Sequence, residues 1–256
     1  MPWIILGAIA IGLSLGMLGS GGSILTVPVL TYLVGQPEKL AIASSLAIVG
    51  GISLLGVIPY AVRREIDWRS VVWFGLPGML VTYVVAMVAQ HIPGVVQMLI
   101  FAVIMATAAW RMLSSGRKNA PTTMDTPPQS KLAMVRTGVL VGGVTGIVGV
   151  GGGFLIVPAL ILLVGLTMRR AVGTSLVVIS TNALSGFVKY AGALKAMQLA
   201  LDWHVIVSFV AIGGVGTLVG NAVGARLPQH RLKQGFGGML VLMSIYMLIR
   251  ETPKLF

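Results

Sequence analysis

The chain contains one sequence pattern twice, and this duplication constrains its fold more than any other feature. When residues 12–61 are aligned with residues 142–191, nineteen of the fifty positions are identical. After a five-residue insertion the match continues, and the Asp-Trp pair at 67–68 aligns with the one at 202–203. Two related halves in an apolar chain are typical of membrane transporters, whose halves enclose a central substrate site. Solenoid arrays, in contrast, are built from three or more shorter units.

The composition places this duplicated chain in a membrane. Of the 256 residues, 56% are hydrophobic and 9% are charged, which lies far outside the range of soluble globular proteins. Uncharged runs cover residues 40–62, 70–90, 137–168 and 205–225, and several reach the roughly 20 residues that a membrane helix needs. The sequence therefore predicts an all-α polytopic membrane protein. Its two homologous halves, residues 1–113 and 132–256, are joined by a polar linker at 114–131.

Each half is expected to contain two short apolar helices followed by three longer ones. The predicted ranges are 3–18, 24–34, 39–62, 70–90 and 93–113 in the first half, and 132–148, 153–165, 169–191, 202–225 and 229–249 in the second. An unbroken helix over residues 137–168 would be about 48 Å long against a hydrocarbon core of about 30 Å. We therefore expect it to break at the glycines of 149–153, and its counterpart to break at 19–23. The result is a glycine-broken helical hairpin in each half, with its tip buried in protein; whether the hairpins cross the whole membrane stays open.

The basic residues indicate how the halves are oriented. The net charge is +12, but the charges lie in short connections and form no continuous face, so nucleic acid is not an expected partner. If each hairpin returns to the side from which it enters, thirteen of the eighteen basic residues share one face. That face is then cytoplasmic, and the halves are inverted repeats. If each short pair is one broken span, twelve share a face and the repeats are parallel, so the count favours inversion by one residue.

The two glycine-rich tips are the main candidate for a binding site. A glycine run before a helix exposes several amide N–H groups, and the helix N-terminus adds positive potential, so together they favour an anion. Tips that enter from opposite sides are expected to meet near the midplane. The alternative is that these glycines only allow close helix packing. The candidate tip residues are Gly21, Gly22, Ser23, Gly151, Gly152 and Gly153.

Hydroxyl groups form a second candidate, because they occur at equivalent positions near the starts of two long helices. Ser44 and Ser45 in the first half align with Thr174 and Ser175 in the second. A hydroxyl at a helix start either caps free amides or donates to an oxyanion. Both uses stay open at this point.

Three further polar residues within apolar helices are candidates for the site. Tyr60 aligns with Tyr190, and Lys189 lies late in a predicted helix, where it either has a function or extends its ammonium group to the membrane interface. Asn182 and Asn221 also lie within apolar helices, so each is expected to need a hydrogen-bond partner.

Several kinds of chemistry are not supported by the residues present. The chain has no cysteine, and its six acidic residues fall in predicted loops or at helix ends, so none is placed to bind Na⁺ or relay protons within the membrane. Two of them, Asp67 and Asp202, are expected to cap helices beside interfacial tryptophans. The three histidines show no metal-ligand spacing, and no nucleophile–base pair is evident. We therefore expect no cofactor, no metal and no catalytic residue.

Two long motifs carry the repeat, GVGGGFLIVPALILLVGLTMRRAVGTSL at 149–176 and GSGGSILTVPVL at 19–30. They resemble the sulfite exporter TauE/SafE family, with the first half departing from the pattern at Ser23 and at Ala43. The resemblance implies a multi-pass permease of the bacterial cell inner membrane that exports small sulfur oxyanions or organosulfonates. It carries over Gly151–Gly153, Thr174 and Ser175 as motif positions, while the equivalent positions of the first half rest on the internal repeat.

The resulting hypothesis is a transporter in which the halves move relative to one another around a midplane anion site. The expected partners are a small anionic substrate and the lipid bilayer, with a homodimer left open. The rival hypotheses are an uptake permease or a channel for another small solute, and a membrane assembly subunit without transport activity. The sequence leaves the substrate, the coupling ion and the direction of flux undecided.

Overall fold

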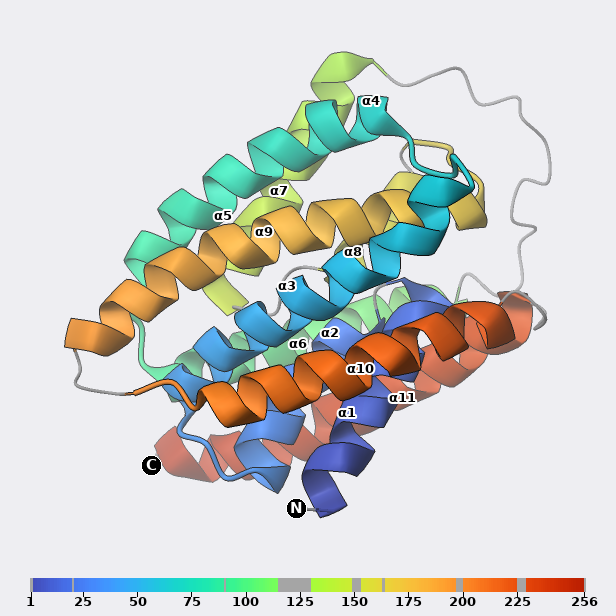
Figure 1. Ribbon diagram of the computed structural model, residues 1–256. Coiled ribbons are helices and arrows are strands. Elements are labelled where there is room, and N and C mark those ends of the chain that lie inside the picture. Colours follow the sequence, from blue (N-terminus) through green and yellow to red (C-terminus); the bar gives the residue numbers. More distant parts are fainter. Residues whose placement is uncertain are drawn as a thin grey trace.

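The computed structural model describes residues 2–19, 21–89, 91–114, 130–148, 153–162, 164–196, 200–224 and 229–255. All regular elements in these ranges are helical, which confirms the predicted all-α class. The helices lie side by side in one bundle, in which α3 and α9 run between the α5–α7 pair and the α1–α10 pair (Figure 1).

The helices of the two halves follow the same order. Those of the first half are α1 (Pro2–Leu18), α2 (Gly21–Pro28), a π-helical turn (Val29–Leu33), α3 (Glu38–Val62), α4 (Trp68–Ser70), a second π-helical turn (Val71–Gly75), α5 (Leu76–Ala89) and α6 (Gly94–Ser114). Those of the second half are α7 (Lys131–Val148), α8 (Gly153–Leu162), α9 (Met168–Ala196), α10 (Trp203–Gly224), α11 (Gln229–Glu251) and a 3₁₀ turn (Thr252–Leu255). In repeat terms α1 corresponds to α7, α2 to α8, α3 to α9, α5 to α10 and α6 to α11.

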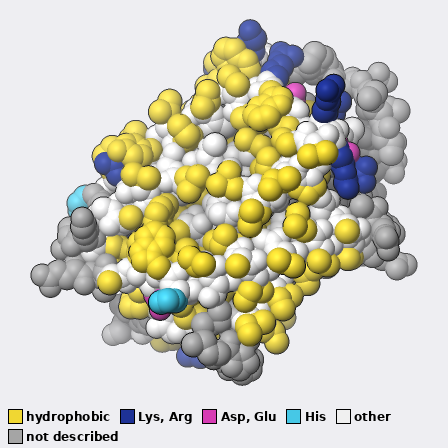
Figure 2. Space-filling model, viewed as in Figure 1, with side chains coloured by type: hydrophobic (Ala, Val, Ile, Leu, Met, Phe, Trp, Pro, Cys, Tyr) yellow, Lys and Arg dark blue, Asp and Glu magenta, His cyan; other side chains and the backbone are white. Residues whose placement is uncertain are grey.

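The chain is a multi-pass membrane protein by the length and apolarity of these helices. Within the described ranges, five helices are long and apolar enough to span a bilayer: Glu38–Val62, Trp68–Ala89, Lys131–Val148, Arg169–Gly192 and Trp203–Gly224. Shorter apolar helices accompany them. Hydrophobic side chains are spread over the whole visible surface (Figure 2), as expected of a protein whose outer face meets lipid tails.

The central helices α3 and α9 cross in antiparallel directions. A Cβ built on Gly56 would lie 3.3 Å from Leu176, and one built on Gly186 would lie 3.3 Å from Leu46. Residues late in one helix thus contact residues early in the other, as expected of helices that run in opposite directions. Both helices are largely buried inside the protein, so they form the core around which the remaining helices are arranged.

Each half places its first helix against the fourth helix of the other half. On one side α1 packs on α10, and a Cβ on Gly12 would meet the backbone of Gly213. On the other side α7 packs on α5, and a Cβ on Gly142 would meet the backbone of Gly78. The repeat register relates Gly12 to Gly142 and Gly213 to Gly78. The two helix pairs are therefore the same interface, built twice with the halves exchanged.

A threonine hydroxyl closes each of these glycine contacts. Thr217 Oγ1 donates to the Gly12 carbonyl at 3.0 Å, and Thr82 Oγ1 donates to the Gly142 carbonyl at 3.0 Å. Such hydrogen bonds across an interface of small residues are typical of helix association in membranes. A threonine four residues after a glycine on α5 and on α10 is thus the sequence signal for the interface.

Both short helix pairs also end in the same way. Gly35 and Gly165 adopt left-handed backbone conformations, with φ of 78° and 77°. Just beyond them, the amide of Gln36 donates to the Leu30 carbonyl and that of Leu166 donates to the Leu160 carbonyl, each at 3.0 Å. Glycine is needed at this turn because a side chain is strained at positive φ.

One end of the bundle collects the basic loops, and we call it the arginine end. It contains Arg63 and Arg64 just after the end of α3, Arg69 in α4, and Arg169 and Arg170 at the start of α9. In Figure 2, most of the visible Lys and Arg side chains gather toward the upper right, where Figure 1 shows α4.

The two aspartates cap helices as predicted. The Asp67 carboxylate accepts from the Ser70 amide at 3.1 Å, and the Asp202 carboxylate accepts from the amides of His204 and Val205 at 3.0 and 3.1 Å. The tryptophans that follow, Trp68 and Trp203, are exposed, as side chains at a membrane interface are.

The glycine interface predicts a large difference between two adjacent substitutions. Gly142→Ala forces a methyl group against the backbone of Gly78, so we expect the protein to lose about 1–3 kcal/mol of stability through overpacking. Gly143→Ala is the matched control, because its Cβ would meet only Val81 at 3.9 Å. That variant should keep its stability or gain up to about 1 kcal/mol from helix propensity. Thermal unfolding of the purified protein in detergent distinguishes them, and equal melting temperatures would contradict the interface.

Candidate functional site

The tip of the first hairpin lies on the second half of the chain. Gly19 has φ of 68° and sits against Val172 of α9, whose Cγ1 would lie 2.7 Å from a Cβ built on the glycine. Ser175 Oγ donates to the Gly19 carbonyl at 3.2 Å and to the Val172 carbonyl at 2.7 Å. The predicted hydroxyl Ser175 and the predicted tip are therefore in contact, although they are far apart in the sequence.

Two helices start at this first tip. Helix α2 begins at Gly21, directly after the tip, and α9 begins at Met168, so that its first two turns reach Gly19. The first amides of each helix have no partner within the helix, and the helix dipoles add positive potential at both N-termini. This part of the tip is thus suited to a small anion.

The tip residues Gly22 and Ser23 also have a structural role. A Cβ on Gly22 would meet the carbonyl of Ile11 and the side chain of Leu15 on α1, so glycine there allows α2 to fold back against α1. Ser23 is fully buried in this hairpin. Gly22 therefore allows close helix packing, which was the alternative role for the glycines. This role is compatible with amides at the start of α2 that have no partner within the helix.

The first tip lies toward one end of the central pair, where we expected it near the middle. The contacts of α3 with α9 place the middle of that pair near Gly51 and Asn182. Val172 and Ser175, which meet Gly19, precede Asn182 by ten and seven residues, or about 10–15 Å along a helix. The first tip therefore lies away from the middle of the central pair, because α1 is long enough to bring it toward the arginine end; a site at the bilayer midplane stays a prediction.

The second tip falls largely outside the described residues. Gly151 and Gly152 are not among them, and Gly153 is described only as the first residue of α8. Their role as tip residues stays a prediction.

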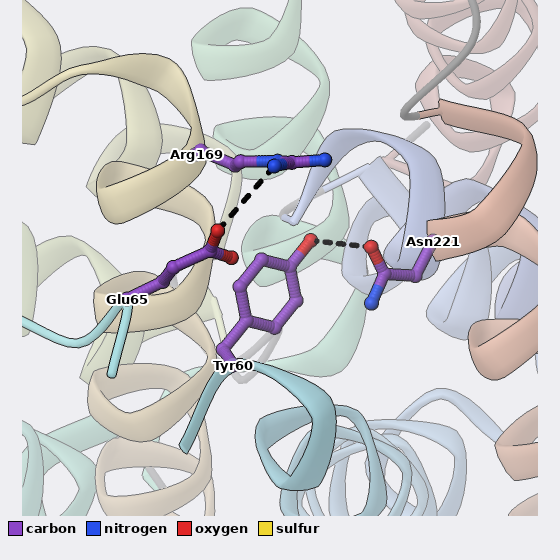
Figure 3. Close-up of polar contacts among 4 residues, drawn as sticks. All are labelled: Tyr60, Glu65, Arg169 and Asn221. Atoms are coloured by element: carbon purple, nitrogen blue, oxygen red, sulfur yellow. Dashed lines mark hydrogen bonds and ion pairs between the residues drawn. The ribbon is translucent and has the colours of Figure 1, made fainter. Parts of the chain in front are cut away.

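Four polar side chains lie close together at the arginine end (Figure 3). Tyr60, in the last turn of α3, is 4% exposed, and its hydroxyl donates to Asn221 Oδ1 on α10 at 3.1 Å. Beside it, Arg169 Nη1 lies 3.4 Å from Glu65 Oε1 in an ion pair. The Arg169 side chain is 58% exposed, so water screens this pair and the guanidinium remains accessible to a solute.

The equivalent tyrosine at the other end is held in a denser network. Gln97 Nε2 donates to the Tyr190 hydroxyl and to the Ile147 carbonyl, each at 2.7 Å, and Lys39 Nζ donates to Gln97 Oε1 at 2.8 Å. The Tyr190 hydroxyl in turn donates to the Gly146 carbonyl at 3.3 Å. These bonds connect the start of α3, the start of α6, the end of α7 and the second half of α9.

The two ends are related by the repeat but differ in chemistry. Lys39 and Arg169 are equivalent, and so are Tyr60 and Tyr190. Gln97, however, aligns with Leu232, which has no hydrogen-bonding side chain. The sequence analysis did not select Lys39, Arg169 or Gln97, although alignment of the halves would have paired the two cations.

The remaining predicted hydroxyls have unequal surroundings. Ser45 Oγ donates to the Ile42 carbonyl at 2.7 Å, as its counterpart does at the start of α9. Thr174 Oγ1 accepts from the Asp67 amide at 2.9 Å and so fixes the loop between α3 and α4. Ser44, its counterpart, is fully buried with no partner for its Oγ.

Lys189 does not lie near a helix end as predicted. Helix α9 continues to Ala196, so Lys189 is within it, and its Nζ lies 4.6 Å from the centre of the Tyr83 ring on α5. A cation over an aromatic face is a stabilising contact. This contact explains how a charge is accommodated here, and it does not connect Lys189 to the described first tip.

Glu251 is the acidic residue that the sequence analysis underestimated. It is the last residue of α11, as expected, but it is fully buried and accepts from the Tyr32 hydroxyl at 2.8 Å. Among the described residues, no group of three or more His, Asp or Glu side chains is arranged to hold a metal ion.

Comparison with known proteins gives one family. A family model described as "Sulfite exporter TauE/SafE" matches residues 4–247. A "Probable membrane transporter protein" of Xylella fastidiosa (strain 9a5c) is 33% identical over 252 residues, which cover 96% of this chain and 94% of that protein. Proteins of the same description from Haemophilus influenzae and Methanocaldococcus jannaschii are 26% and 23% identical, each over at least 96% of both chains. No solved structure matches the chain significantly.

The unequal networks predict unequal effects of removing the two tyrosine hydroxyls. Tyr190→Phe deprives Gln97 of one acceptor and Gly146 of its donor, so we expect a loss of about 1–2 kcal/mol. Tyr60→Phe removes a single hydrogen bond to a partly exposed Asn221 and should cost less than about 1 kcal/mol. Melting temperatures of the two variants in detergent test this, and a larger loss for Tyr60→Phe would contradict the assignment.

Proposed function

Because the chain belongs to the TauE/SafE family of membrane transporters, we propose that it exports small sulfur-containing anions such as sulfite or organosulfonates. The observation that supports this most is the construction of the first tip from both halves. Its backbone belongs to the first half, whereas Ser175 and Arg169 belong to the second. A site shared between two parts of a protein changes its access when those parts move.

The chemistry of the first tip favours an anion without a buried positive charge. The amides at the starts of α2 and α9 offer hydrogen bonds to several oxygens of one solute, and the Ser175 hydroxyl, which donates to the Gly19 carbonyl, holds the tip in place. The exposed guanidinium of Arg169 attracts anions to this end. We assign equivalent roles to Gly151, Gly152, Gly153, Ser44 and Ser45 at the second tip.

We assign the movement to two helix groups that each mix the halves. The glycine interfaces bind α1 to α10 and α7 to α5, so the repeats themselves cannot separate as bodies. The antiparallel crossing of α3 and α9, together with the exchanged interfaces, supports an inverted repeat. In such a repeat one group faces the first tip and the other faces the second, and rocking between them alternates access.

The membrane potential suffices in principle for export. A cell interior that is negative expels an anion with about 2.3 kcal/mol per charge per 100 mV. With the arginine end facing the cytoplasm, as the positive-inside rule requires, Arg169 meets the anion before transport. The location proposed is the bacterial cell inner membrane, and a homodimer stays a hypothesis.

The proposal is tested first by ligand-dependent stabilisation. Sulfite, sulfate, thiosulfate, taurine, sulfoacetate and chloride are each titrated while the melting temperature is followed. A solute that binds the folded state stabilises it by about 2.7 kcal/mol at about 100 times its Kd. We expect one sulfur compound to act selectively, and Ser175→Ala and Gly152→Ala to weaken its effect. Thr107→Val, which removes an exposed hydroxyl on α6, is the control that should respond as the wild type does.

No shift with any solute, in a protein that unfolds cooperatively, would favour another substrate or the subunit without transport activity. Export itself is tested in vesicles with an imposed potential and no proton gradient, where saturable flux and counterflow are expected. Uptake driven by a proton gradient alone would contradict the uncoupled mechanism, and flux without saturation would favour a channel.

A further inference from the structure

Most of the buried hydroxyl groups within the described helices donate to backbone carbonyls. Serines and threonines on α2, α7, α9, α10 and α11 donate to a carbonyl three or four residues earlier, and Thr82 on α5 donates to α7. The bonded residues are Thr26, Thr82, Thr137, Thr145, Ser175, Ser180, Thr181, Thr217 and Ser244. This pattern is expected, since a polar group without a partner is costly in an apolar environment.

The exceptions inside the spans all lie on the central helix pair. Among the described residues, Ser44 and Ser53 on α3 have no partner for Oγ, and Asn182 on α9 has none for either Oδ1 or Nδ2. All three residues are fully buried. Further described side-chain atoms without partners belong to Thr31, Gln36 and Glu65, which lie in turns or in a loop.

Asn182 lies near the middle of the α3–α9 pair and faces α5. A Cβ built on Gly78 would be 3.4 Å from Asn182 Nδ2 and 3.7 Å from Oδ1. In the first half the equivalent residue is Ile52, which faces Gly213 of α10 in the same way. Isoleucine thus packs well at this position in the first half. The packing therefore does not require the polar amide that Asn182 has in the second half.

We propose that Asn182 and Ser53 form an intermediate anion-binding station between the two tips. This inference rests on the proposed function and adds a site to it. The first tip lies about 10–15 Å from the middle of the central pair by the helical rise, so a solute that crosses from one tip to the other passes this region. The Asn182 amide on α9 and the Ser53 hydroxyl on α3 are buried donors without partners among the described residues, and an anion with several oxygens accepts hydrogen bonds from donors of this kind.

The station is neutral, and this suits a transport path. A fixed cation at the middle would hold the anion too tightly, because charges interact strongly in a medium of low dielectric constant. Neutral donors replace part of the hydration shell and let the solute leave again. The station therefore selects by hydrogen-bond geometry while the cations Lys39 and Arg169 remain at the two ends of the central pair.

The test is to give each position the residue of the other half. Asn182→Ile and Ser53→Ala copy Ile52 and Ala183 of the equivalent positions, so both variants should fold. Without solute, Asn182→Ile should melt at a higher temperature than the wild type, because a buried amide without a partner is removed. In the titration with sulfite and taurine, its apparent Kd should rise about tenfold or more, as for a lost hydrogen bond to a charged group. Ser53→Ala should show a smaller rise.

Thr181→Val is the matched control, because Thr181 is next to Asn182 and its hydroxyl already bonds to the carbonyls of Val177 and Val178. It should leave solute affinity and flux unchanged. If the wild type responds to sulfite or taurine and Asn182→Ile responds equally, the station is wrong and the proposed function stands. If Asn182→Ile melts lower and keeps full affinity, Asn182 has a structural role and the station is again wrong. If the wild type responds to neither solute nor to the other four, the proposed function fails and the station fails with it.

Discussion

The structure depends on backbone contacts between glycines of different halves. At Gly12 and Gly142 the first helix of each half lies so close to the fourth helix of the other that a methyl group has no room. In a membrane, apolar side chains gain little by leaving lipid, so helices associate through such close contacts and through hydrogen bonds across them. The position of α3 and α9 follows from this, because both are enclosed between the two glycine interfaces. The positions of the tips depend on these interfaces as well, since each short helix directly follows α1 or α7 in the chain.

The alignment of the halves predicted most of the fold. The expected helix ranges agree with the observed ones within a few residues for most elements, because uncharged runs, Asp-Trp caps and glycine breaks each have a direct physical meaning in a membrane. The exchanged pairing of α1 with α10 and of α5 with α7 was not predicted, although the Gly-x-x-x-Gly spacing at Gly12 and Gly142 was visible. Such spacing identifies a contact face and leaves open which helix will occupy it.

The candidate site was predicted only in part. Ser175 and the first tip do meet, because the two motif segments, one from each half, converge in space. The midplane position was expected because inverted repeats generally place their substrate there, whereas α1, with 17 residues, brings the first tip toward the arginine end of the central pair. Gln97 had no signal in the repeat, since the other half carries leucine there. The unpartnered state of Asn182 required coordinates, because a sequence predicts that an amide needs a partner but does not locate one.

The exchanged interfaces also affect how the protein is made. Gly12 enters the membrane early in translation, and its partner Gly213 emerges near the end, after a delay of about 10–40 s at about 5–20 residues per second. During that time the narrow glycine face of α1 is exposed to lipid or is held by the insertion machinery. Helix α5, in contrast, waits only for α7, which follows soon after the linker. Assembly of the bundle is therefore expected to start at the α5–α7 side, and α1 reaches its final position only after α10 has been made.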